Sequence, residues 1–108
     1  MFRELLKLFP IRKFKISGHS MEPLLKADDK VLASYIPYFF SNPKIGDLIA
    51  LISPTTQKTL IKRIKEVEND SYFITGDNAN DSHDSRSFGW IRKKDIIGKV
   101  IYNSKVKI

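Results

Sequence analysis

Apolar residues recur with two different periods along this chain of 108 residues. Near the start, Phe2, Leu5, Leu6 and Phe9 fall at i, i+3, i+4 and i+7, the spacing of one helix face. Pro10 ends the pattern, because proline disrupts a helix interior. Residues 1–10 are therefore predicted to form a short amphipathic N-terminal helix, and residues 11–108 a single domain.

After residue 10 the apolar residues occur in short segments separated by turn residues, which is typical of β structure. Turn pairs such as Asn42-Pro43 and Asn69-Asp70 mark the separators. With no long helix to make parallel crossovers, the pattern predicts a mainly β fold, a small antiparallel β barrel or sandwich. We expect strands at residues 12–17, 30–35, 47–53, 59–67, 71–75 and 96–103, with a weaker one at 105–108.

Two segments do not fit a plain β domain. Residues 17–25 read SGHSMEPLL and place small and polar residues between apolar strands. Residues 76–89 read GDNANDSHDSRSFG, a polar stretch bounded by glycines. Long loops without secondary structure in a compact domain are typically functional. Both segments are therefore predicted to carry the chemistry.

Composition narrows the classes of function. The chain has no cysteine and two histidines, so we expect neither a disulfide, nor a metal site, nor another cofactor. Nineteen Lys and Arg against twelve Asp and Glu give a net charge of +7, but the positive charge gathers near the two ends with no RNA-binding motif between them. A nucleic-acid partner is therefore not expected. No apolar run of about 18 residues is present, so the sequence predicts no transmembrane helix in this chain.

A serine can attack an amide only if a neighbouring group removes its proton. His19 adjoins Ser20, but neighbouring side chains on an extended segment point in opposite directions. His83 lies in the polar loop and stays an alternative base. Lys62 is a third candidate, because burial can lower the pKa of a lysine from about 10.4 and leave it neutral.

Periodicity favours a buried position for Lys62. In the predicted strand at 59–67, Leu60, Lys62 and Ile64 share one face, which is the apolar one, and Arg63 lies on the other. On this pattern alone, an ordinary surface lysine with a partly covered stem stays an alternative.

Four short motifs follow one another in the chain: SGHSMEP at 17–23, KIGD at 44–47, Lys62-Arg63, and GDN at 76–78 leading to DSR at 84–86 and Gly89. Their order and spacing resemble the type I signal peptidase family over about residues 14–101. The resemblance implies the β catalytic core of that family over residues 11–108. It also implies a serine endopeptidase with a Ser/Lys dyad, which cleaves signal peptides or a propeptide after small residues at P1 and P3.

The resemblance assigns roles to single residues. Ser20 corresponds to the nucleophile and Lys62 to its general base. The backbone N–H of Ser20 corresponds to the oxyanion hole; Gly18 stands where some members add a hydroxyl, so Ser17 is the candidate for side-chain help. Ser82 corresponds to the serine that orients the lysine. Asp77, Asp84 and Arg86 correspond to structural support of the site, with Asp84 and Arg86 as a salt bridge.

Some features depart from the family pattern. Leu24 stands where a threonine is usual, and the transmembrane anchor and the large insertion of many bacterial members are missing. What remains is a minimal form, similar to the maturation peptidase of nickel-type superoxide dismutase. Because archaeal and endoplasmic-reticulum members have histidine in place of Lys62, the bacterial or organellar type is the closer match.

Two alternatives stay open: a self-cleaving peptidase domain of the LexA type, and a non-catalytic basic β module that binds nucleic acid or membrane. The apolar face of residues 2–9 and the aromatic run at 35–40 either contact a membrane surface or pack on each other as core. A peripheral position at the cytoplasmic membrane and a soluble protein are accordingly both expectations.

Overall fold

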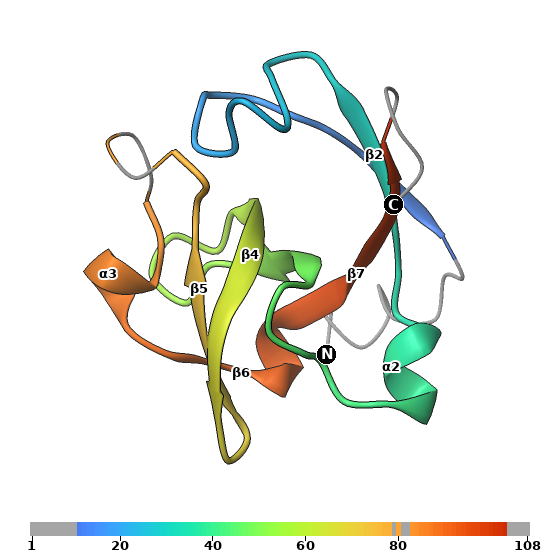
Figure 1. The fold of residues 1–108 in the computed structure, drawn as a ribbon, viewed down its shortest axis with the longest axis vertical. Helices are drawn as coiled ribbons and strands as arrows, with labels where there is room; N and C mark the ends of the chain where they lie inside the picture. The colour runs from blue at the N-terminus through green and yellow to red at the C-terminus, as the bar shows by residue number, and fades with distance from the viewer. Residues whose placement is uncertain (1–10, 79, 81–82, 104–108) are drawn as a thin grey trace.

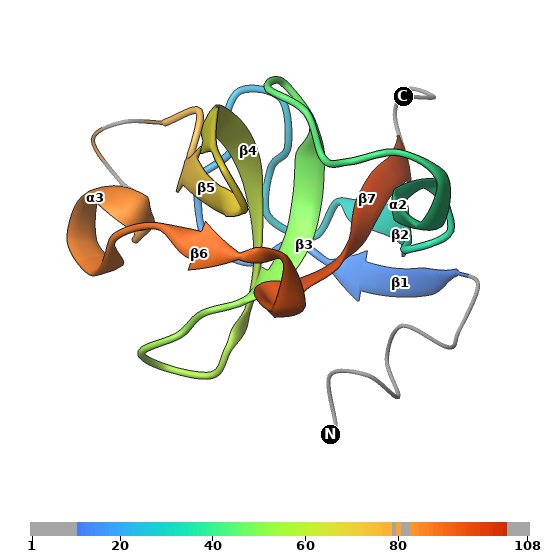
Figure 2. The same ribbon diagram turned by 90° about the horizontal axis from the view of Figure 1, so that it is seen from below.

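The computed structural model describes residues 11–78, 80 and 83–103. These residues form one antiparallel sheet of seven strands that curls into a half-barrel, with the order β1-β2-β7-β3-β4-β5-β6 (Figures 1 and 2). The mainly β prediction is confirmed. The strands are β1 (Arg12–Lys15), β2 (Lys30–Ser34), β3 (Leu48–Ile52), β4 (Thr59–Glu68), β5 (Ser71–Thr75), β6 (Ile91–Arg92) and β7 (Ile96–Asn103).

The predicted strand limits agree with the structure to within two residues, and those of β5 and β7 are identical. Strand β6 was not predicted. It is only two residues long and exists because Ile91 and Arg92 pair with Tyr72 and Ser71 of β5. The predicted N-terminal helix and the weak strand at 105–108 lie outside the described residues.

Strand β3 lies at the centre of the fold, and all five of its residues are buried. Successive side chains of a strand point to opposite faces. Leu48, Ala50 and Ile52 therefore contribute to a first core cluster, and Ile49 and Leu51 to a second. The first also contains Ile16, Met21, Leu25, Val31, Ala33, Ile97 and Val100; the second also contains Tyr35, Tyr38, Ile64, Tyr72, Ile74, Ile91 and Ile96.

Among the described residues, three short helical segments lie between strands: α2 (Pro37–Phe40), α3 (Ser85–Phe88) and the 3-10 turn η1 (Lys93–Asp95). Helix α3 corrects the expectation that residues 76–89 lack secondary structure. It begins after Asp84, whose side chain accepts a hydrogen bond from the Arg86 backbone N–H, and this N-cap satisfies a donor at the helix start.

Two segments lie close together at one end of the sheet: the 17–29 loop that joins β1 to β2, and the segment that follows β5 (Figure 1). The base of the 17–29 loop is closed by two backbone bonds. The Ile16 N–H donates to the Asp29 carbonyl at 2.7 Å, and the Asp28 N–H donates to the Ile16 carbonyl at 2.9 Å. The loop is therefore anchored where β1 ends and β2 begins.

Candidate active site

Ser20 and Lys62 meet although 42 positions separate them in the chain. The Lys62 Nζ atom donates a hydrogen bond to the Ser20 Oγ atom at 2.7 Å. Lys62 is only 3% exposed. An amine and a serine hydroxyl in direct contact, with the amine shielded from water, are the components of proton transfer from the hydroxyl.

The register of β4 determines where Lys62 points. Lys62 lies opposite Ile49 of β3, and directly opposed residues of paired strands point to the same face. Ile64, two residues further along, is fully buried on this face. Arg63 points to the other face, where its Nη1 atom donates to the Gly46 carbonyl at 3.0 Å.

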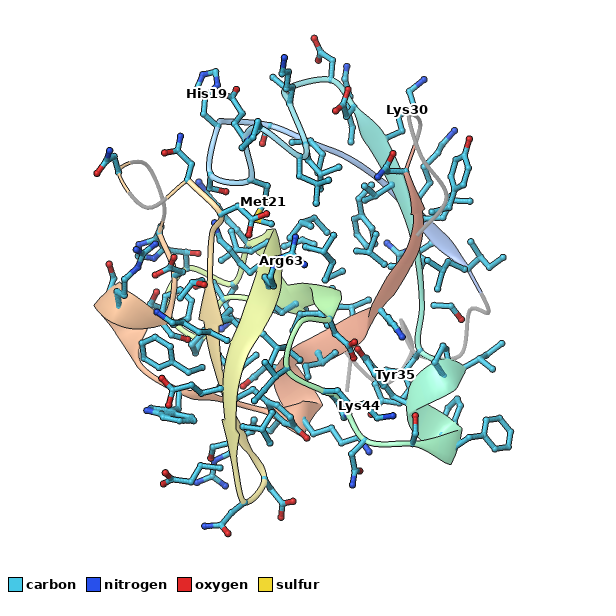
Figure 3. All side chains as sticks on the ribbon, viewed as in Figure 1. His19, Met21, Lys30, Tyr35, Lys44 and Arg63 are labelled. Carbon is cyan, nitrogen blue, oxygen red and sulfur yellow. The ribbon has the colours of Figure 1, made fainter. Side chains whose placement is uncertain are left out.

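The loop that carries Ser20 is held from the opposite side by the segment after β5. The Asn78 backbone N–H donates to the Ser20 carbonyl at 2.8 Å, and its side-chain Nδ2 donates to the His19 carbonyl at 3.1 Å. The Asp77 backbone N–H contacts the sulfur of buried Met21 at 3.4 Å, and Figure 3 labels Met21 next to Arg63. Both neighbours of Ser20 in the chain are thus fixed.

The two histidines have other contacts. His19 Nδ1 lies 2.5 Å from a carboxylate oxygen of Glu22. The His83 ring packs edge-on against Phe88, with 5.2 Å between ring centroids. Within the described part of the chain, Ser20 makes no contact with the ring of His19 or of His83.

The acidic candidates occupy two separate hydrogen-bond groups. Asp77 accepts from Arg63 Nε at 2.9 Å and Nη2 at 3.0 Å, and this contact raises the pKa of Arg63 above its ordinary value. Asp84 is completely buried; it accepts from the Gly76 N–H at 2.8 Å and from Arg86 Nη2 at 2.6 Å, and the pKa of Arg86 is raised for the same reason. The Asp77 group joins the segment after β5 to strand β4. The Asp84 group joins the same segment to helix α3.

Ser20 and Lys62 line a groove of about 150 Å³. Ser17 lines the same groove and is exposed. The backbone N–H of Ser20 has no acceptor among the described residues. Ser82 lies outside the described residues. The other lining residues are Phe14, Lys15, Ile16, Met21, Thr59, Leu60 and Ile61, and we call this space the candidate groove.

Sequence reasoning did not select Asn78, Arg63 or Met21 as site residues. Asn78 and Arg63 belong to the GDN and Lys-Arg motifs, so a signal for them was present. Their roles could not be predicted from the sequence. Asn78 donates hydrogen bonds to backbone carbonyls, and Arg63 donates to a carboxylate 14 positions away.

The sequence of the chain matches a protein family and several relatives. The family model described as "Signal peptidase, peptidase S26" matches residues 2–65 and 64–104. The chain is similar to signal peptidase I of Leptolyngbya laminosa, with 24% identity over 80% of this chain and 64% of the relative. It is also similar to the probable thylakoidal processing peptidase 2 of Arabidopsis thaliana, with 25% identity over 81% of this chain and 36% of the relative.

The chain spans less than two thirds of the length of these curated relatives. The two parts of the family match meet at residues 64 and 65, directly after Lys62 and Arg63. This is the start of the stretch where the family resemblance implies the insertion of many bacterial members. The four motifs therefore all fall within the matched residues, on one side or the other of that point.

Proposed function

The chain belongs to the signal peptidase family, peptidase S26, and we propose that it is a serine endopeptidase with Ser20 as nucleophile and Lys62 as general base. The observation that carries the proposal is the 2.7 Å contact between the Lys62 amine and the Ser20 hydroxyl, made by a lysine that is 3% exposed. Burial favours the neutral form of an amine, and only that form can accept a proton.

The proposed reaction has two stages. The neutral Lys62 amine takes the hydroxyl proton while Ser20 Oγ attacks the peptide carbonyl carbon, and the resulting oxyanion is bound by the Ser20 backbone N–H. The Lys62 ammonium then gives its proton to the leaving amine as the C–N bond breaks, which leaves an acyl-enzyme. Water, deprotonated by Lys62, attacks the ester carbonyl carbon; as the C–O bond to Ser20 breaks, the Lys62 ammonium returns the proton to Ser20 Oγ and the acid product leaves. The Ser17 hydroxyl lines the same groove and is the candidate second donor to the oxyanion.

The surroundings of the groove support an extended peptide substrate. Strand β1 is the edge of the sheet in the described chain, and β5 pairs with β4 only from Arg63 onward. The groove therefore runs between a sheet edge and the beginning of β4, where a peptide can add as a strand. The walls of the groove include Phe14, Leu60 and Ile61, so it suits apolar side chains, and the family resemblance implies small ones at P1 and P3.

The test uses a peptide with alanine at P1 and P3. Ser20→Ala and Lys62→Met should each abolish cleavage while the far-ultraviolet circular dichroism stays that of the wild type. Because the two groups act as one unit, the double variant should be hardly slower than either single variant. Lys65→Met is the matched control, since Lys65 is an exposed lysine of the same strand. Cleavage retained by either single variant would exclude the dyad.

A membrane surface is proposed as the place of action. At the end of β2, the apolar side chains of Ile36, Phe39 and Phe40 are exposed by 45%, 63% and 86%. Ile11, which precedes the pairing of Arg12 with Ala33, is exposed at the same end of the sheet. Exposed aromatic residues favour the interface between water and lipid. Within the described residues, no helix is long and apolar enough to cross a bilayer.

The aromatic run divides between surface and core. Tyr35 and Tyr38 are buried, and the Tyr38 hydroxyl donates to Asp47 at 2.7 Å. The Tyr35 ring packs edge-on against Phe39 with 5.1 Å between ring centroids, and Figure 3 labels Tyr35 beside α2. A test of membrane binding must therefore leave both tyrosines in place.

Binding is measured by co-sedimentation with anionic and neutral vesicles. Phe39→Ser/Phe40→Ser should weaken sedimentation with both, while the control Val67→Ser, an exposed apolar residue of β4, should not. Equal binding of the double variant and the wild type would contradict this proposal and leave the peptidase assignment untouched.

A further inference from the structure

The edge of β1 beside the candidate groove carries two exposed lysines. The strand alternates between partly buried and exposed positions, with Phe14 toward the interior and Lys13 and Lys15 toward solvent. Lys15 is itself one of the residues that line the groove. A peptide strand in the groove would therefore lie next to a row of positive charge.

The backbone of this edge is oriented to receive such a strand. The N–H and carbonyl of Ile16 both bond across to the residues before β2, at Asp29 and Asp28. In an antiparallel pair, the backbone groups of successive residues point alternately to the partner and away from it. Those of Lys15 and Ser17 therefore point toward the groove and can pair with a bound peptide.

From this arrangement we infer that the enzyme prefers substrates with acidic side chains at P2 and P4, the positions that alternate with the small P1 and P3 residues. Directly opposed residues of paired strands point to the same face. A peptide whose P1 and P3 side chains enter the groove beside Phe14 turns its P2 and P4 side chains outward, beside Lys13 and Lys15. This inference rests on the proposed peptidase function and adds a charge preference to it.

Other charges near this edge do not cancel the lysines. Lys15 Nζ lies 3.4 Å from an Asp28 carboxylate oxygen, but the two side chains are 66% and 83% exposed, and ion pairs so exposed are weak. Lys15 can therefore exchange Asp28 for a substrate carboxylate. Lys13 has no carboxylate partner among the described residues, and Lys58, just before β4 on the other side of the groove, is also positive.

The test compares three peptides that are identical except for Glu, Gln or Lys at both P2 and P4, with alanine at P1 and P3. In low salt, kcat/KM for the Glu peptide should exceed that for the Gln peptide by about two- to fivefold, the range expected for opposite charges across paired strands, and the Lys peptide should be the slowest. The preference should fall toward one at about 1 M salt, where the Debye length is about 3 Å.

The Glu-to-Gln ratio in variants identifies the residues responsible. It should drop to near one in Lys13→Gln/Lys15→Gln and stay at the wild-type value in Lys94→Gln, which removes an exposed lysine from η1. A wild-type ratio of one, or a ratio unchanged in the double variant, would overturn the inference while cleavage of the Gln peptide still upholds the proposed function. If the wild type cleaved none of the three peptides, the proposed function would fall, and this inference with it.

Discussion

Replacing Lys62 with methionine should stabilise the protein while it abolishes activity. The proposed role requires a neutral amine in the folded protein, whereas the same lysine is charged in the unfolded chain at pH 7. Giving up that proton costs about 4–5 kcal/mol at pH 7 for a group with an ordinary pKa of about 10.4. Methionine avoids this cost and loses the hydrogen bond to Ser20, whose net contribution is about 0.5–1.5 kcal/mol.

The variant should therefore be more stable by about 3–4 kcal/mol at pH 7. The difference depends on pH with a definite sign. A wild-type chain that binds one proton more when unfolded gains stability as pH rises, by about 1.4 kcal/mol per pH unit below the ordinary lysine pKa. The variant lacks this dependence, so its advantage should shrink to about 1 kcal/mol near pH 9.

Urea unfolding of wild type, Lys62→Met and Lys65→Met at several pH values between 7 and 9 measures this slope. Lys65 is exposed, so Lys65→Met should follow the wild type. A difference between wild type and Lys62→Met that stays constant with pH would mean that Lys62 is charged in the folded protein, and the base assignment would be refuted. Because this slope requires an amine that is already neutral at pH 7, kcat/KM of the wild type should be level between pH 7 and 9 and fall below pH 7, where the amine of the folded protein becomes protonated.

Three other substitutions test the surroundings of the site. Asp84→Ala should lower the free energy of unfolding by about 2–4 kcal/mol in urea titration, because it leaves the buried Gly76 N–H without its acceptor; an effect below about 1 kcal/mol would contradict the supporting role. Tyr38→Phe should cost about 1–2 kcal/mol, and because burial and the bond to Asp47 raise the pKa of Tyr38, this cost should stay constant up to about pH 10. Asn78→Ala should lower kcat about three- to tenfold with little change in urea midpoint, since its side chain bonds an exposed loop carbonyl; an unchanged kcat would mean that the backbone bond alone fixes the loop.

Most of the sheet could be predicted because its strands are apolar runs with clear turn residues between them. Strand β5 follows Asn69-Asp70, and β7 is rich in β-branched residues, so their limits were readable. Helix α2 and strand β6 were not, because four and two residues are too few to show a period. Helix α3 could have been predicted from its limits, because Asp84 before it and Gly89 after it are typical of helix ends. The polar composition of the segment favoured a loop instead.

The site residues, too, could be predicted from the sequence only in part. Alternation along β4 indicated the face of Lys62, because that face is shared with Ile64. Its partner could not be found by periodicity, since Ser20 lies in a loop whose path depends on tertiary contacts, and the pairing came from the family resemblance. The hydrogen bonds that Asn78 donates to two backbone carbonyls could not be predicted either, because every residue type has a backbone carbonyl.

The contacts explain how three of the four short motifs, although far apart in the chain, form one structure. Lys62 is followed by Arg63, whose guanidinium holds Asp77; Asp77 is followed by Asn78, which binds the carbonyl of Ser20. The path leads back to Lys62 through the bond between its amine and the Ser20 hydroxyl. Neighbouring side chains of a strand point to opposite faces, so the strand can bury Lys62 while it presents Arg63 to the segment after β5. A shift of β4 by one residue would exchange these two positions, and the register of β4 against β3 therefore fixes both the proposed base and the support of the proposed nucleophile.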